Sequence, residues 1–181
     1  LAGDEETGAT IMRVMRAVDA GPVVAQVRTP VGPFDTTASV TDRVADLGGE
    51  LLLKTLRRWV AGEIEATAQD EEAATQAPRL TRPDGVIDWS DAAIDIWRKV
   101  RAFQPWPQAT TRYDDQRFTV LEAWPLEAGV TAQIGDAVVG EVIGGGGVEL
   151  SELLPGRVAT AVVACGTGSL ALLRVQRAGR R

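Results

Sequence analysis

The sequence contains no histidine and only one cysteine among its 181 residues. Histidine is the commonest general acid or base near neutral pH, so catalysis by this chain alone would need carboxylates, lysine, cysteine or a metal. A single cysteine, Cys165, cannot form an internal disulfide, and we interpret it as a small buried residue. Without histidine it also cannot build a zinc site, so we predict no resident metal.

Long apolar runs are absent as well. No 18-residue apolar stretch occurs, which excludes a membrane-spanning helix, and no basic and apolar leader argues for secretion. Hydrophobic residues make up 45% of the chain, which is enough to bury a core. We therefore expect a cytoplasmic, monomeric protein of one domain or two small ones.

The net charge of −6 argues against general affinity for nucleic acids, but the charge is unevenly distributed. Residues 1–76 hold seven basic and thirteen acidic residues, whereas residues 77–181 hold twelve of each. The end of the chain, "LLRVQRAGRR", is basic. Such a tail is usually solvated surface, and contact with phosphate is the alternative.

The first half of the chain predicts two strands and a helix. The strands, residues 10–18 and 23–31, are rich in β-branched residues and flank the turn signal Asp-Ala-Gly-Pro. Residues 35–65 have apolar positions at helical spacing, with Gly48-Gly49 as a candidate break and Gly62 as a C-cap. The candidate N-caps of this helix are Thr36, Thr37 and Ser39.

Residues 65–83 are polar and contain two prolines, so we interpret them as a linker and place a domain boundary there. A second helix is predicted over residues 88–103, with Ser90 as its N-cap. Short extended runs follow, separated by turn residues, and Gly144–Gly147 is expected to be a loose loop. Five or six strands at this spacing indicate a small β-barrel.

Two groups of residues are candidates for function. Asp4–Gly8 predicts an acidic loop before a strand, where carboxylates could bind a metal or orient a base, and a solvated turn is the alternative. Tryptophans could stack on bases, but they are more often anchors of a core. Those of the second half are Trp89, Trp97, Trp106 and Trp124.

Together these blocks resemble the methionyl-tRNA formyltransferase family. "LAGDEETGATIM" followed by "VDAGPVV" is similar to the end of the family's catalytic domain, and "APRLTRPDGVIDWS…IWRKVRAFQPWPQA" to the start of its C-terminal domain. The combination of Ile-Asp-Trp-Ser, Arg-Ala-Phe and Pro-Trp-Pro makes the second match specific. Gln104 departs from the family, which usually has asparagine there.

The resemblance implies an α/β plus β fold. Residues 1–64 would be the C-terminal portion of a Rossmann-like formyltransferase domain, residues 65–83 a linker, and residues 84–181 an OB-like β-barrel that binds tRNA. The implied reaction transfers a formyl group from 10-formyltetrahydrofolate to the amino group of methionyl initiator tRNA.

The resemblance also implies site residues. Asp4 corresponds to the catalytic aspartate of the family's Gly-Asp-x-x-Thr-Gly loop, and Asp4, Glu5 and Glu6 would lie at the folate cofactor. We expect tRNA to be contacted by Arg79, Arg82, Arg101, Arg174 and Arg177.

The family's catalytic asparagine and histidine would lie upstream of Leu1, so we expect the isolated chain to be inactive and Asp4 to belong to half a site. A carboxylate beside an imidazole holds its tautomer, but it orients nothing when the imidazole is missing. The alternatives are a non-catalytic RNA-binding or interaction module, and a fragment of a sugar or folate formyltransferase.

Overall fold

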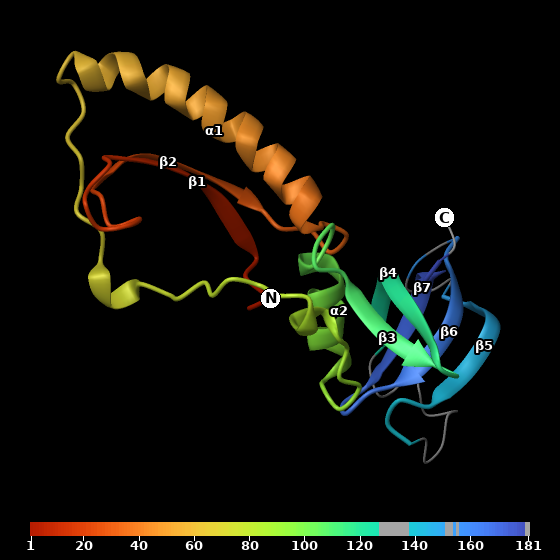
Figure 1. The fold of residues 1–181 in the computed structure, drawn as a ribbon. Coiled ribbons are helices and arrows are strands. Elements are labelled where there is room, and N and C mark those ends of the chain that lie inside the picture. The colour runs from red at the N-terminus through yellow and green to blue at the C-terminus, as the bar shows by residue number, and fades with distance from the viewer. Residues whose placement is uncertain (127–137, 151–153, 155, 180–181) are drawn as a thin grey trace. The chain divides into compact units, whose positions relative to one another are not determined.

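The computed structural model describes residues 1–126, 138–150, 154 and 156–179, and for residues 144–149 it describes the backbone alone. The chain divides into two compact units. The first is Asp4–Arg79, and the second is Leu80–Arg181 together with Leu1–Gly3. Figure 1 traces the elements of both along the chain.

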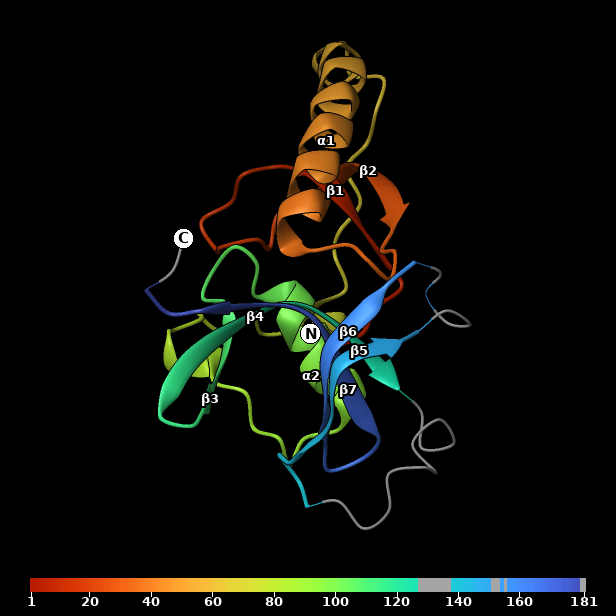
Figure 2. The same cartoon turned by 90° about the vertical axis from the view of Figure 1, so that its right-hand side faces the viewer.

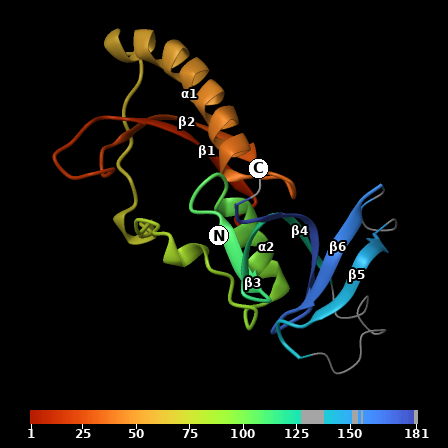
Figure 3. The same ribbon diagram turned by 45° about the vertical axis from the view of Figure 1, so that its right-hand side comes forward.

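The first unit is a two-stranded antiparallel sheet covered by one helix. Strand β1 (Glu6–Met12) pairs with β2 (Val23–Pro30), and helix α1 (Thr37–Val60) packs along both (Figure 3). Glycine permits the close approach, because a Cβ added at Gly48 would lie 3.2 Å from the Cβ of Ala9. The Gly48-Gly49 pair therefore does not break the helix, as the sequence had suggested, and Gly48 is the one of the two that lies against the sheet.

The N-cap of α1 is Thr36, one of the three candidates from the sequence, whereas its C-cap is Ala61 and not the predicted Gly62. The Thr36 side chain accepts from the backbone N–H of Ser39, and the Ser39 side chain accepts from the N–H of Thr36, which completes a capping box. At the other end Gly62, just past the C-cap Ala61, has a φ of +74°. This left-handed conformation explains the glycine.

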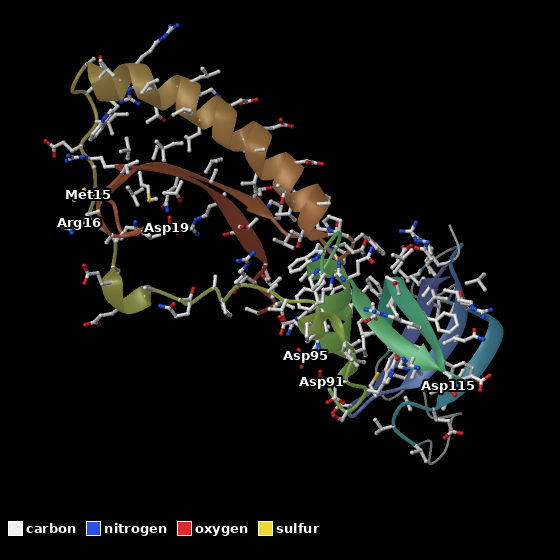
Figure 4. The ribbon with its side chains drawn as sticks, in the orientation of Figure 1. Met15, Arg16, Asp19, Asp91, Asp95 and Asp115 are labelled. Carbon is white, nitrogen blue, oxygen red and sulfur yellow. The ribbon has the colours of Figure 1, made fainter. Side chains whose placement is uncertain are left out.

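The first strand was predicted too late in the chain. β1 begins at Glu6 and ends at Met12, and residues 13–22 form a loop. The Arg13 N–H donates to the Pro22 carbonyl at 3.0 Å and so closes this loop. The β-branched residues that suggested a longer strand are not buried beyond Met12, since Val14 is 93% exposed. Figure 4 labels Met15, Arg16 and Asp19 along this loop.

The segment after α1 is tied to the same unit. Thr67 forms an isolated bridge with Val23, and the Gln69 amide donates to the carbonyls of Asp19 and Gly21. A short 3-10 helix, η1 (Glu71–Ala73), follows. The start of the predicted linker thus closes the β1–β2 loop.

In the residues that the structure describes, the second unit is a five-stranded antiparallel sheet with one α-helix and one short 3-10 helix. Its helical elements are η2 (Pro83–Gly85) and α2 (Ala93–Ala102), and its strands are β3 (Ala109–Tyr113), β4 (Gln116–Leu126), β5 (Val142–Glu149), β6 (Val158–Ala164) and β7 (Ser169–Arg177). The strand order is β3-β4-β7-β6-β5 (Figure 2). Among the described residues no ladder joins β3 to β5, so the described sheet is open.

Two local predictions in this unit were wrong. Ser90 is not the N-cap of α2, because it forms a turn with Asp88 while the Ala93 N–H donates to the Thr167 carbonyl at 2.9 Å. Gly144–Gly147 is not a loose loop, because it lies within β5, where the register against β6 shifts. In both places contacts distant in sequence decide the local structure.

The sheet is packed on both sides. Ile96 and Val100 of α2 are buried against Val120 and Leu170 in one cluster, and Leu126 belongs to a second. Burying a side chain of this size contributes about 1.5–3 kcal/mol. The second unit therefore has a core of its own.

Candidate functional site

The residues that resemble the family's catalytic loop lie at the start of β1. Asp4 precedes the strand and is exposed, Glu5 forms a bend, and Glu6 begins the strand. The expected acidic loop is therefore only its first two residues, since Glu6, Thr7 and Gly8 are paired to β2.

Gly8 is explained by the strand pairing. A Cβ at this position would collide with the carbonyl oxygen of Val27 on β2. Glycine is the residue that allows such close backbone contact. The glycine of the motif is therefore required by the hairpin itself.

The outer face of this hairpin is a shallow polar hollow of about 220 Å³. Glu6 and Arg28 form an exposed ion pair in it, 3.4 Å apart. Exposed pairs of this kind contribute little to stability. Of the three predicted cofactor residues, Glu6 lines this hollow, whereas Asp4 and Glu5 precede the strand.

A denser polar cluster, which the sequence did not reveal, lies at the end of β2. Two guanidinium nitrogen atoms of Arg43, on α1, donate to the Asp35 carboxylate at 2.6 and 3.0 Å. The same guanidinium also donates to the Thr29 hydroxyl and the Pro30 carbonyl. The hydrogen bonds from the Arg43 guanidinium hold the pKa of Asp35 well below its usual range. The Asp35 carboxylate is therefore ionised at neutral pH.

The arginines predicted to contact tRNA differ in exposure and lie on different elements. Arg174 and Arg177 are exposed on β7, opposite Glu122 and Phe118 of β4. Arg101 is half-buried, with its guanidinium carbon 3.9 Å from the centre of the Trp97 ring. Arg82 is exposed beside η2, and Arg79 is exposed at the end of the first unit.

Two further exposed arginines of the second unit were not among the residues predicted from the sequence. Arg112 and Arg117 lie directly opposite each other across the β3–β4 hairpin, and both are exposed. The Arg117 carbonyl accepts from Ala178, so the end of β7 that carries Arg177 lies beside them. Asp115, at the hairpin tip labelled in Figure 4, contacts Arg112. The Asp114-Asp115 turn, with positive φ at both residues, is the signal that would have set this register.

The tryptophans have different roles. Trp97 and Trp124 pack edge to face with ring centres 5.6 Å apart, which confirms the interpretation of these two as packing residues. Trp89 donates to the Thr111 hydroxyl at 3.0 Å. Trp106, between two prolines, is 51% exposed.

An apolar hollow of about 270 Å³ lies on the sheet of the second unit. Trp89, Tyr113 and Phe118 line it, and Arg112 is its one charged lining residue within the described part of the chain. Elsewhere in that part, no group of three or more acidic, cysteine or histidine side chains is placed to hold a metal ion. No helix there has the length and apolarity needed to cross a membrane.

Comparison with known families and proteins gives two family matches. The model of the formyl transferase C-terminal domain matches residues 79–181, and the formyl transferase model matches residues 1–56. The chain is 38% identical over 181 residues to the methionyl-tRNA formyltransferase of Methylococcus capsulatus, and covers 53% of that protein. It is 39% identical over 182 residues to that of Nitrosococcus oceani, covering 51%. The chain thus spans about half the length of these relatives.

Solved structures share the fold at lower identity. HypX from Aquifex aeolicus in complex with tetrahydrofolic acid matches 97% of this chain with a TM-score of 0.63 and 21% identity, and 28% of that chain is covered. WlaRD, a sugar 3N-formyl transferase, matches 99% with a TM-score of 0.64 and 14% identity, and 57% of that chain is covered. At these identities the likeness concerns the fold.

Proposed function

The chain belongs to the formyl transferase family, and we propose that it is the C-terminal half of a methionyl-tRNA formyltransferase. The observation that carries the proposal is the identity of 38% along the whole chain to an enzyme of that name. The sugar formyltransferase WlaRD shares the fold, so an amino sugar is the second candidate acceptor. It ranks second because the identity to WlaRD is only 14%.

In the proposed reaction the α-amino nitrogen of methionine on initiator tRNA attacks the formyl carbon of 10-formyltetrahydrofolate. The bond between the formyl carbon and N10 of the donor breaks, the attacking amine loses one proton, and N10 takes up one proton as tetrahydrofolate leaves. Asp4 would orient a histidine supplied by the half of the enzyme that this chain does not span, and Glu5 and Glu6 would lie near the folate. A carboxylate so placed fixes the imidazole tautomer and stabilises its protonated form.

The second unit, together with Arg79 at the end of the first, would bind the tRNA. A five-stranded antiparallel sheet of short strands is compatible with an OB-like barrel, a fold that commonly binds nucleic acids. Phosphates would be contacted by the arginines named from the sequence, Arg79, Arg82, Arg101, Arg174 and Arg177, and also by Arg112 and Arg117. Such contacts position a nucleic acid without reading its sequence. The whole enzyme would work as a cytoplasmic monomer in translation initiation.

A chimera tests the proposal. The N-terminal half of the Methylococcus capsulatus relative is joined upstream of Leu1, and formyl transfer from 10-formyltetrahydrofolate is measured with methionyl-tRNA and with a nucleotide-linked amino sugar. We expect the chimera to formylate methionyl-tRNA and the 181-residue chain alone to formylate neither. Transfer to the amino sugar alone, or activity of the isolated chain, would overturn the proposal.

A further inference from the structure

We propose that the Asp35–Arg43 pair is a positioning device that holds the start of β1, and with it Asp4, in place. The proposal rests on the function proposed above, because it assigns importance to the position of Asp4. Every contact that carries it lies within the first unit, Asp4–Arg79.

Arg43 donates through all three of its side-chain nitrogen atoms, and two of them bind the end of β2. Nε donates to the Thr29 hydroxyl at 3.1 Å, and Nη2 donates to the Pro30 carbonyl at 2.8 Å. Nη1 and Nη2 donate to the two oxygens of Asp35 at 3.0 and 2.6 Å. Two parallel hydrogen bonds from the planar guanidinium restrict the orientation of the carboxylate more than a single hydrogen bond does.

The other side of Asp35 fixes the turn and the first turn of the helix. Its Oδ2 accepts from the Gly32 N–H at 2.8 Å, and its Oδ1 accepts from the Ser39 hydroxyl at 2.8 Å. Arg43 and Asp35 therefore join three elements: the end of β2, the turn at residues 31–36 and the start of α1.

The end of β2 in turn holds the residues that follow Asp4. Thr29 is paired with Thr7, and Pro30 is paired with Glu6. The next N–H, that of Val31, donates to the Glu5 carbonyl at 2.8 Å. Asp4 directly precedes Glu5, and the Glu5 carbonyl is bound by Val31, the residue after the end of β2 that Arg43 contacts.

The physical consequence is sensitivity of turnover to small displacements. A shift of about 1 Å in a catalytic group costs on the order of 100-fold in rate. Lysine at position 43 keeps the charge but cannot reproduce the fork, whereas methionine loses both. The two replacements should therefore give graded effects.

The first experiment is amide hydrogen exchange on the 181-residue chain. We expect the Val31 amide to exchange at least tenfold faster in Arg43→Met and by an intermediate factor in Arg43→Lys. The matched control is Arg58→Met on the same helix, since Arg58 contacts Glu63 at 3.4 Å in an exposed pair. The control should leave Val31 unchanged. Exchange at Val31 that is unaffected in a folded Arg43→Lys chain would overturn the proposal.

The second experiment measures turnover in the chimera described above, corrected for the folded fraction. We expect kcat to fall about 10- to 100-fold in Arg43→Met, with KM changed less than twofold and part of the loss restored by lysine. A fall that disappears after the correction would mean that the pair only stabilises the fold. If the unsubstituted chimera is inactive, the proposed function fails, while the Val31 exchange still decides whether the pair holds β1.

Discussion

Arg112 and Arg117 lie directly opposite each other in the β3–β4 ladder. Like charges in this position repel, and the Asp115 carboxylate, 3.9 Å from the Arg112 guanidinium, offsets only part of this repulsion in an exposed pair. Together with Arg177, which is paired with Phe118 one residue further along β4, they form a basic end of the sheet. A phosphate backbone is the partner that the proposed function supplies.

We predict that Arg112→Gln and Arg117→Gln each weaken tRNA binding and reduce the slope of log affinity against log salt by about 1. The measurement is a salt titration of tRNA affinity, with Arg174→Gln and Arg177→Gln alongside. Lys54→Gln is the control, because Lys54 is an exposed residue paired with Glu50 on α1. Slopes that the arginine variants leave unchanged would mean that this end of the sheet is only solvated surface.

Asp4→Asn should lower kcat of the active chimera much more than it weakens tRNA binding. The amide keeps the shape of the side chain but loses the charge that stabilises an imidazolium, and loss of such a carboxylate costs up to about 10⁴-fold in turnover. Steady-state kinetics and a tRNA binding measurement separate the two effects. Near-normal kcat would remove Asp4 from the catalytic set, and Glu6→Gln tests whether a neighbouring carboxylate acts instead.

The stability that Asp35 contributes should depend on pH. The hydrogen bonds from Arg43 lower the pKa of Asp35 in the folded protein, so this contribution is complete above the pKa of the unfolded chain, about 3.9, and is lost as the pH falls further. Asp35→Asn should therefore be less stable than the natural chain at pH 7, with the difference shrinking below about pH 4. Urea unfolding at pH 7 and pH 3 checks this, and a difference independent of pH would contradict it.

Cys165 should react slowly with thiol reagents. Burial raises the pKa of its thiol to about 11, and the thiolate is the reactive form. At pH 8 only about one thiol in 1,000 would then be ionised, so we expect labelling at least 100-fold slower than in the urea-unfolded chain. Equal labelling rates in the folded and unfolded chains would show that the residue is accessible.

The two adjacent glycines of α1 should respond differently to alanine. A Cβ at Gly49 meets no atom within 4 Å, so Gly49→Ala should stabilise the helix by about 0.5–1 kcal/mol. At Gly48 the new methyl group would press on Ala9, and the same gain should be reduced or reversed. Thermal unfolding of both variants makes the comparison, and an equal gain at both sites would show that α1 does not pack closely on β1.

The sequence by itself determined the features that depend on neighbouring residues. The capping box of Thr36 and Ser39, the periodicity of α1 and the left-handed Gly62 are local, because a cap is satisfied by residues three or four positions away. The family resemblance came from short motifs in the same way. The packing roles of Trp97 and Trp124 also followed, since large aromatic side chains in a small domain are usually buried.

Only the tertiary structure decided the features that depend on partners distant in sequence. α2 begins at Ala93 because the carbonyl of Thr167 receives its N–H, and no side-chain cap marks that position. Gly144–Gly147 lie in a strand because β6 pairs with Gly144 and Gly145 and again with Val148, although glycine itself favours a loop. Arg43 reaches Asp35 and Thr29 only once α1 lies on the sheet, since a hydrogen-bond network between elements exists only after they have packed together.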